Sequence, residues 1–218
     1  MNIDGLLKRF FPMQENAPVT IEVFDKDSVY AVFGDIVRLL NASPDIELGV
    51  LQGLSYCFYE VLDNVLTHSE KQCGTTIMRY MVERGLIQIL VADDGIGVQA
   101  SLAENEAFKG LSEEDALRRC IEDKVTDGKG MGFGLYSTSR LVKNAGIQLV
   151  IHSGHSVMTY NGEEITITQA GFWQGTLVYF ELHANREIDP NEVVDNRMDC
   201  AGQFNDMFLE DDDIDELW

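Results

Sequence analysis

Three polar residues follow one another at four-residue intervals in the segment YEVLDNVLTHS: Glu60, Asn64 and His68. On a helix these positions share one face, so the side chains would point the same way, roughly 6 Å apart. An asparagine amide oxygen is a hard ligand suited to Mg²⁺, which takes few protein ligands and keeps waters and phosphate oxygens. A glutamate one turn earlier can activate water or a hydroxyl group as a general base. A solvated helix face would show the same spacing, so this motif alone decides nothing.

A second candidate group is Asp93, which directly follows the apolar run LIQILVA and opens DDGIG. A carboxylate at a buried strand end is costly unless it is hydrogen-bonded. It could accept a hydrogen bond from the exocyclic amine of adenine, which would select adenine over guanine. Gly95 and Gly97 would let the backbone turn sharply and approach a flat base, and Thr176 could place a hydroxyl beside Asp93. An ordinary turn after a strand is the simpler alternative for this motif taken by itself.

The third motif is GKGMGFG, in which glycines alternate directly before an expected helix. Glycines let successive N–H groups converge on phosphate oxygens, and a helix N-terminus adds its dipole. The segment is neither a Walker A loop, because no G-K-[ST] follows, nor a dinucleotide fingerprint, because no strand leads directly into it. It could also serve as a hinge for the loop before it. The candidate phosphate-binding residues are Lys129, Gly130, Met131, Gly132, Phe133 and Gly134.

Hydrophobic periodicity supplies the elements that must position these motifs. Alternating and β-branched runs predict strands, and apolar residues at helical spacing predict helices. A capping box at Ser112 predicts one more short helix. Together they predict an α+β fold: a two-layer α/β sandwich with a mixed, mostly antiparallel sheet and helices on one face. Strands are expected at 18–24, 75–83, 86–92, 147–152, 157–160, 163–168 and 176–182, and helices at 27–40, 47–68 and 134–144.

The same pattern divides the chain into three parts. Residues 1–46 would add a strand and a helix to the domain that residues 47–182 complete with the three motifs. Within that domain, residues 98–127 form a connection too long to be a simple loop, and such a connection is usually functional. Residues 183–218 would be an acidic tail. Within it, residues 205–218 have apolar residues set among acids, which would allow that segment to dock in a basic groove, or it could merely keep the protein in solution.

Composition narrows the classes of function. The chain has 218 residues, of which 45% are hydrophobic, and a net charge of −21. That charge disfavours binding to nucleic acid. The sequence contains no apolar run long enough to span a membrane, and four scattered cysteines without C-x-x-C spacing favour reduced thiols and a cytoplasmic location. Residues 128–162 contain no acid, which favours an anionic ligand near the glycine-rich motif, although chance would explain it too.

In this order the motifs resemble those of the GHKL superfamily of ATPases, which includes histidine-kinase catalytic domains, gyrase-type enzymes, heat-shock chaperones and mismatch-repair ATPases. YEVLDNVLTHS, with His68, is similar to the N box, DDGIG to the G1 box, GKGMGFGLY to the G2 box, and QGTLVYFEL to the last box. The resemblance runs from about Glu47 to Leu182. It implies a Bergerat-type ATP-binding fold with ATP and Mg²⁺ as cofactors.

The resemblance also implies roles for single residues. Glu60 would be the general base, Asn64 the Mg²⁺ ligand, and Asp93 the adenine contact, supported by Thr176. Residues 98–127 would be the ATP lid. No role is assigned to the histidine of the N box. The base pocket and the phosphate site would be shaped by Gly95, Gly97, Gly130, Gly132 and Gly134.

Within the superfamily the chain is most similar to the stand-alone bacterial class that includes anti-sigma factor serine kinases. No second ATPase-coupled domain is expected after the motifs, and no helix with a phosphoacceptor histidine before them. The resemblance then implies a small regulatory partner protein, of the antagonist or sigma-factor type, and is compatible with a homodimer. Two functions stay open: an ATPase or protein serine/threonine kinase, or an ATP-gated binding module with little or no catalysis.

Overall fold

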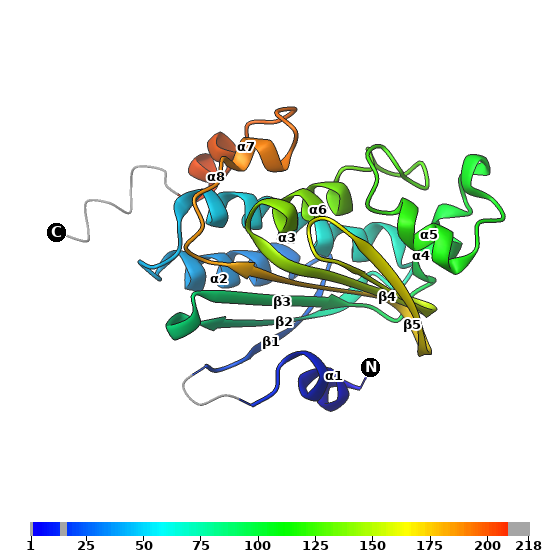
Figure 1. Cartoon of the computed structure of the whole chain (residues 1–218), viewed down its shortest axis with the longest axis horizontal. Helices are drawn as coiled ribbons and strands as arrows, with labels where there is room; N and C mark the ends of the chain where they lie inside the picture. Colours follow the sequence, from blue (N-terminus) through cyan, green and yellow to red (C-terminus); the bar gives the residue numbers. More distant parts are fainter. Residues whose placement is uncertain (1, 14–16, 209–218) are drawn as a thin grey trace.

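A five-stranded sheet with the order β1-β2-β3-β5-β4 runs through the molecule (Figure 1). The computed structural model describes residues 2–13 and 17–208. Every neighbouring pair of strands is antiparallel, so the sheet is antiparallel throughout instead of mixed. A short 3₁₀ turn at Val82–Arg84 joins the second strand to the third. The strands are β1 (Thr20–Asp25), β2 (Cys73–Met81), β3 (Leu86–Ala92), β4 (Gly146–Tyr160) and β5 (Ile165–His183).

The last two strands are longer than the periodicity predicted. The four short strands expected between residues 147 and 182 are two long ones, β4 and β5. Their register shifts on both sides of Gly154. A bulge of this kind interrupts the alternation of side chains without ending the strand, which explains why the sequence appeared to break there.

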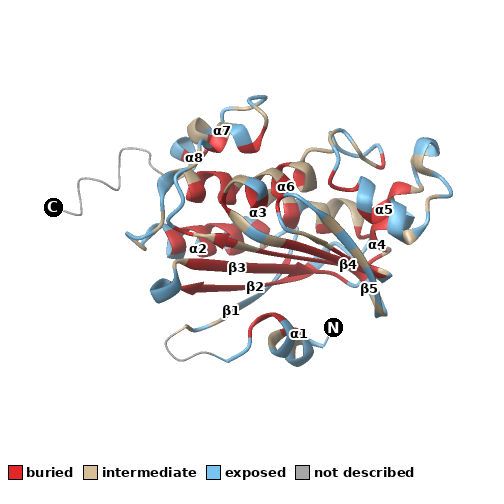
Figure 2. Ribbon diagram, in the orientation of Figure 1, coloured by how far each residue is buried: buried red, intermediate tan, exposed pale blue. Residues whose placement is uncertain are grey.

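The longest helices that cover one face of the sheet are α2 (Val29–Asn41), α3 (Leu48–His68) and α6 (Gly134–Ala145). The α3 helix packs against both α2 and α6. It buries an apolar stripe that includes Leu54, Phe58 and Leu62. Figure 2 shows the buried residues concentrated in the sheet and on the helix faces turned toward it. This core fixes α3, the helix that carries the first motif.

The opposite face of the sheet is also covered, although the sequence predicted helices on one face only. The helix α1 (Ile3–Phe10) lies there, below the sheet in Figure 1. Its Leu6 and Phe10 pack in a second core with Tyr179, and the buried Arg79 donates to the Pro12 carbonyl at 2.7 Å. The eight-residue helix was too short for its apolar positions to stand out in the sequence.

The long connection before the glycine-rich motif contains more structure than the one predicted helix. The capping box at Ser112 is confirmed, since its hydroxyl accepts from the Asp115 N–H at 3.1 Å and opens α5 (Glu113–Arg119). In addition there are α4 (Gly97–Leu102) and a 3₁₀ turn at Glu106–Phe108. Ala116 and Leu117 are almost fully buried in the main core. The stretch of residues 98–121 is therefore anchored to the folded core at several points, while most of its other side chains face solvent or are half-buried.

The segment after β5 contains two helices, so the predicted tail at residues 183–218 is corrected as far as Phe208. They are α7 (Pro190–Val193) and α8 (Cys200–Phe208). Phe204 is buried, and the ring of Phe208 lies 5.8 Å from that of Phe33 on α2. Residues 209–218, which carry most of the acidic run, lie outside the described residues.

This packing predicts different outcomes for two neighbouring substitutions in α8. Phe204→Ala removes a buried ring and should lower the free energy of unfolding by about 3 kcal/mol. Met207→Ala removes an exposed side chain and should change it by less than about 0.5 kcal/mol. Urea denaturation followed by far-ultraviolet circular dichroism measures both. Equal stabilities of the two variants would show that α8 is not part of the core.

Candidate functional site

A cavity of about 370 Å³ lies between α3, the end of β3, the middle of β5 and the loop that precedes α6. Its size falls within the range of roughly 300–1,000 Å³ typical of small-molecule sites. The three sequence motifs meet there. All the predicted site residues except Gly95 line the cavity, as does His68: Glu60, Asn64, Asp93, Gly97, Lys129, Gly130, Met131, Gly132, Phe133, Gly134 and Thr176.

Asp93 forms the polar centre of the inner end of this cavity. It is only 3% exposed, and Val91 and Val178, which are register partners on β3 and β5, lie in the same lining. Its Oδ1 accepts hydrogen bonds from the Gly95 N–H at 2.7 Å and the Thr176 N–H at 3.3 Å. No described residue donates to Oδ2. Burial raises the pKa of Asp93 to about 6, although the two N–H donors partly oppose the rise.

The neighbours of Asp93 act through their backbones. Thr176 supports the carboxylate with its N–H and not with the hydroxyl that the sequence suggested. Gly95 does not line the cavity, because its Cα faces the Ser69 backbone, where a Cβ would collide with the carbonyl oxygen. Gly175 was not predicted as a site residue. Its φ is +88°, and a Cβ there would lie 2.5 Å from Asp93 Oδ1, so only glycine fits.

At the other end of the cavity the first and third motifs touch. A Cβ added to Gly134, the first residue of α6, would lie 3.1 Å from both Asn64 Nδ2 and Glu60 Oε2. The N-terminus of α6 therefore faces a carboxylate and an amide on α3. Burial, and to a lesser degree Asp63, raises the pKa of Glu60, and the Tyr56 hydroxyl partly offsets this. A raised pKa makes a carboxylate a stronger base.

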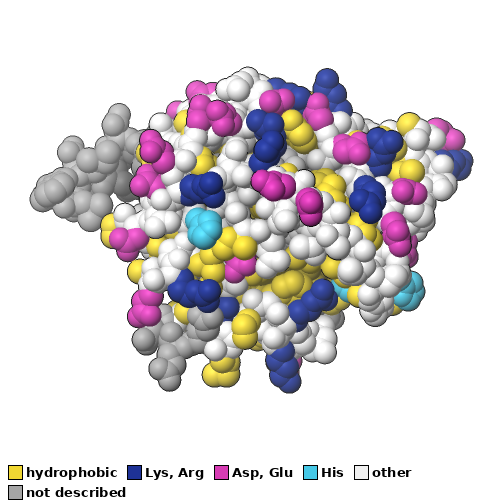
Figure 3. All heavy atoms as spheres, viewed as in Figure 1, with side chains coloured by type: hydrophobic (Ala, Val, Ile, Leu, Met, Phe, Trp, Pro, Cys, Tyr) yellow, Lys and Arg dark blue, Asp and Glu magenta, His cyan; other side chains and the backbone are white. Residues whose placement is uncertain are grey.

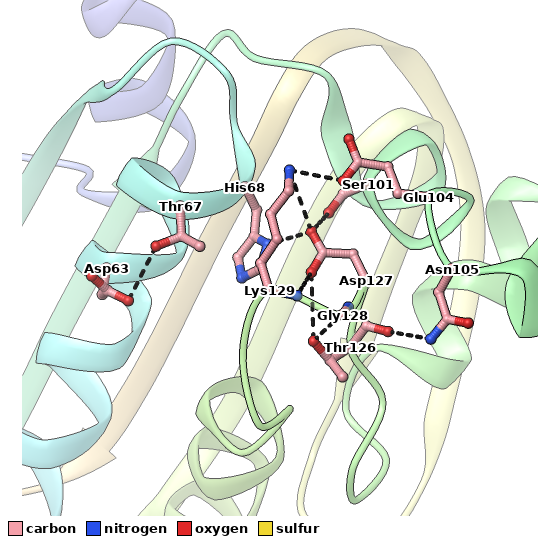
Figure 4. A network of polar contacts seen from close by, with 10 residues as sticks. All are labelled: Asp63, Thr67, His68, Ser101, Glu104, Asn105, Thr126, Asp127, Gly128 and Lys129. Carbon is pink, nitrogen blue, oxygen red and sulfur yellow. Dashed lines mark hydrogen bonds and ion pairs between the residues drawn. The ribbon is translucent and has the colours of Figure 1, made fainter.

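His68, the last of the three polar residues along α3, contacts the carboxylate of Asp127, as Figure 4 shows. Its Nδ1 lies 2.5 Å from Asp127 Oδ2. The side chain of Asp127 is fully shielded from solvent and also accepts from the Ser101 hydroxyl at 3.1 Å and the Lys129 N–H at 2.9 Å. Burial acts to raise the pKa of Asp127, but the Lys129 N–H and His68 outweigh it and lower the pKa overall. The network fastens the glycine-rich loop to α3 and α4.

The ammonium group of Lys129, expected to face an anionic ligand, is engaged with two carboxylates. Its Nζ lies 2.8 Å from Glu104 and 3.8 Å from Asp127, and the contact with Glu104 raises the pKa of Lys129. A phosphate at this position would compete with Glu104 for the same charge.

Sequence reasoning missed several residues of the site. Tyr56 lines the cavity one turn before Glu60, so the four-residue spacing that revealed the stripe could have included it. Asp127 directly precedes the glycine-rich motif, but nothing in the sequence pairs it with a histidine 59 residues away. Met198 comes from the segment between α7 and α8, which carried no recognisable signal.

The oxygen atoms that the cavity wall offers to a metal ion suit Mg²⁺ better than a structural metal. Among residues 2–13 and 17–208 no group of three or more His, Cys, Asp or Glu side chains could hold a metal ion by itself. Asn64 and Glu60 can offer oxygens at the cavity wall. This small set suits Mg²⁺, which takes its remaining ligands from water and phosphate, and does not suit a structural metal.

Comparison with known proteins assigns the fold to a family. Residues 49–186 match the family described as histidine kinase-, DNA gyrase B-, and HSP90-like ATPase. The chain belongs to this family. The match covers more than half of the chain and ends before α7 and α8. No curated protein matches the chain. In the part of the chain that the structure describes, no helix has the length and apolarity needed to cross a membrane.

The raised pKa of Asp93 predicts a pH-dependent stability without nucleotide. Between the unfolded pKa, about 4, and the folded pKa, about 6, the folded protein binds the proton that the unfolded chain has lost. Relative to Asp93→Asn, which keeps the Oδ1 acceptor, the wild-type free energy of unfolding should therefore fall by on the order of 2–3 kcal/mol as pH rises through this window. Urea titrations at several pH values measure the difference. A constant difference between the two proteins would show that Asp93 ionises normally.

The contact at Gly134 predicts a second effect. Gly134→Ala would push Asn64 and Glu60 apart while leaving a good helix former at the start of α6, so the affinity for Mg-ATP should fall about tenfold, or ~1.4 kcal/mol. Gly171→Ala is the control, because a Cβ there meets nothing within 4 Å. Isothermal titration calorimetry measures both. Wild-type affinity in Gly134→Ala would mean that this contact does not shape the binding site.

Proposed function

We propose that the protein binds Mg-ATP in this cavity and uses it to act on a small partner protein, as an ATPase or a protein serine/threonine kinase. The observation that carries the proposal is the contact of Gly134 with both Glu60 and Asn64. It brings a helix N-terminus, a candidate base and a hard oxygen ligand to one point. Membership of the ATPase family supports ATP as the nucleotide.

The inner end of the cavity would hold the adenine. The free Oδ2 of Asp93 can accept a hydrogen bond from the exocyclic amine, and the valine side chains around it suit a flat apolar ring. Guanine carries a carbonyl oxygen at that position, which would face the carboxylate without a proton between them. An unpaired polar contact of this kind in a buried site is costly, so adenine should be preferred.

The outer end would hold the phosphates. The first N–H groups of α6 can bind phosphate oxygens, and the Asn64 amide oxygen can bind Mg²⁺. When bound, Mg²⁺ supplies positive charge that offsets the charge of the phosphate oxygens. Glu60 would accept the proton of a water or of a partner hydroxyl as its oxygen bonds to the γ-phosphorus and the bond to the β-phosphate oxygen breaks.

The partner would be a small regulatory protein of the kind that anti-sigma factor serine kinases act on. The alternative is an ATP-gated binding module, in which nucleotide changes a partner surface and little chemistry follows. One observation favours keeping this alternative: the glycine-rich loop is joined to α3 through the buried Asp127–His68 pair. A nucleotide that rearranged the loop would therefore act on a large part of the molecule.

Substitution of Glu60 separates the two functions. Glu60→Gln should keep Mg-ATP affinity within about twofold but lower phosphate release or transfer by about 10²–10⁴-fold, the usual contribution of a general base. Asn64→Ala and Asp93→Ala should both lose nucleotide binding. Radiolabelled ATP, with the co-purified partner present, measures turnover, and calorimetry measures binding.

Asp35→Asn serves as the control, because this carboxylate is exposed on α2 and pairs with Arg38. Unchanged turnover in Glu60→Gln would remove Glu60 as the base. If nucleotide-dependent partner binding survived Glu60→Gln and no turnover occurred in the wild type, the binding module would be the correct function. Wild-type protein that binds no ATP would contradict both.

A further inference from the structure

One short segment beside the cavity contacts the main hydrophobic core through a single side chain, Val125. Residues 122–133, here called the phosphate-end loop, connect α5 to α6, whereas α4 and α5 before them are packed in the main core through residues such as Val98 and Leu117. Gly128, Gly130 and Met131 in this loop are exposed. This loop is therefore the part of the cavity's outer end that is least fixed by apolar packing.

Two carboxylates tether this loop at different points. Asp127 binds His68 at the end of α3. Asp123 binds Arg197 through both carboxylate oxygens, at 2.5 and 2.8 Å. A bidentate pair of this kind fixes geometry as well as charge. The second tether leads to the segment between α7 and α8, outside the family match.

The Arg197 side chain also lies over the start of α6. Its guanidinium carbon is 5.0 Å from the ring centre of Phe133 and 5.6 Å from that of Tyr136. A second carboxylate, Asp195, accepts from it at 3.0 Å. The next residue along the chain, Met198, lines the cavity. Arg197 therefore contacts both ends of the phosphate-end loop, Asp123 near its start and Phe133 at its end.

The backbone on both sides of this pair is unusual. Lys124, directly after Asp123, has φ of 60°, and Asp195 and Asn196, directly before Arg197, have φ of 59° and 54°. Residues with side chains adopt this left-handed conformation at a cost, and they keep it where surrounding contacts require it. The Asp123–Arg197 pair is the contact that both strained turns share.

The segment that carries Arg197 is itself firmly attached. Arg140 on α6 donates to the Glu192 carbonyl at 2.7 Å, the Gln52 side chain on α3 donates to Asn205 at 3.1 Å, and Phe204 is buried. Where α6 and α7 lie in Figure 3, acidic and basic side chains stand next to one another. A displacement of Arg197 would be passed on to α7 and α8.

We propose that Arg197 is a positioning residue that couples the phosphate-end loop to α7 and α8, so that nucleotide in the cavity and the surface of these two helices respond to one another. The inference rests on the proposed binding of nucleotide. Because coupling between two sites is reciprocal, a partner bound to α7 and α8 would change the nucleotide affinity by the same factor by which nucleotide changes that partner's affinity.

Hydrogen exchange of the full chain tests the coupling. Without nucleotide, Arg197→Ala and Asp123→Ala should each raise exchange in residues 122–133 at least fivefold. With saturating Mg-ATP, wild-type residues 200–208 should change their exchange at least threefold, and both variants should lose this response. The double variant Asp123→Arg with Arg197→Asp should regain at least half of it, which a merely structural role of either residue would not predict.

Arg119→Ala is the matched control, because it removes an exposed ion pair with Glu122 on the same stretch of chain. It should behave as the wild type. The coupling is overturned if nucleotide does not change the exchange of residues 200–208 in the wild type. It is also overturned if the change persists in Asp123→Ala. Calorimetry on the same samples distinguishes failure of the coupling from failure of the proposed function. If the wild-type protein binds no Mg-ATP, both the proposed function and the coupling fail. If it binds Mg-ATP but residues 200–208 do not respond, only the coupling fails.

Discussion

The fixed position of α3 constrains everything else in the site. One side of this helix is locked into the core by residues such as Leu54, Phe58 and Leu62, so its other side cannot rotate. Polar groups at four-residue spacing on that side, from Tyr56 to His68, therefore form a rigid row along the cavity. The glycine-rich loop is fastened to this row at His68, and the first residue of α6 lies against Glu60 and Asn64, which is why motifs far apart in sequence meet.

Two shielded carboxylates at this row have opposite electrostatics because their partners differ. Asp93 receives two backbone N–H groups on one oxygen only, so burial prevails and its pKa rises to about 6. Asp127 receives a histidine, a hydroxyl and an N–H, and its pKa falls. A carboxylate with an unused oxygen is available to a ligand, whereas one with all its positions filled holds structure together. The same residue type thus keeps a free acceptor in one place and ties elements together in the other.

Local patterns revealed the parts of this site that depend on local structure. The helical spacing of Glu60 and Asn64, the strand that ends at Asp93 and the capping box at Ser112 are each decided within a few residues, and the structure has them. What the sequence could not show depends on distant partners: the pairing of His68 with Asp127, or the use of the Thr176 N–H in place of its hydroxyl. The helix α8 was hidden for another reason, because the acidic composition of the segment outweighed its apolar spacing.

Part of the charge of the phosphate-end loop is balanced by a residue outside the region that matches the family. The match ends at residue 186, yet residues beyond it reach the cavity wall and bind the loop, through Met198 and Arg197. The carboxylates of this loop would repel an anionic ligand in the cavity unless cations compensated them. Lys129 provides part of that compensation from within the matched region, and Arg197 provides part of it from outside. Because Arg197 lies between α7 and α8, the charge balance of the loop depends in part on a segment outside the family match.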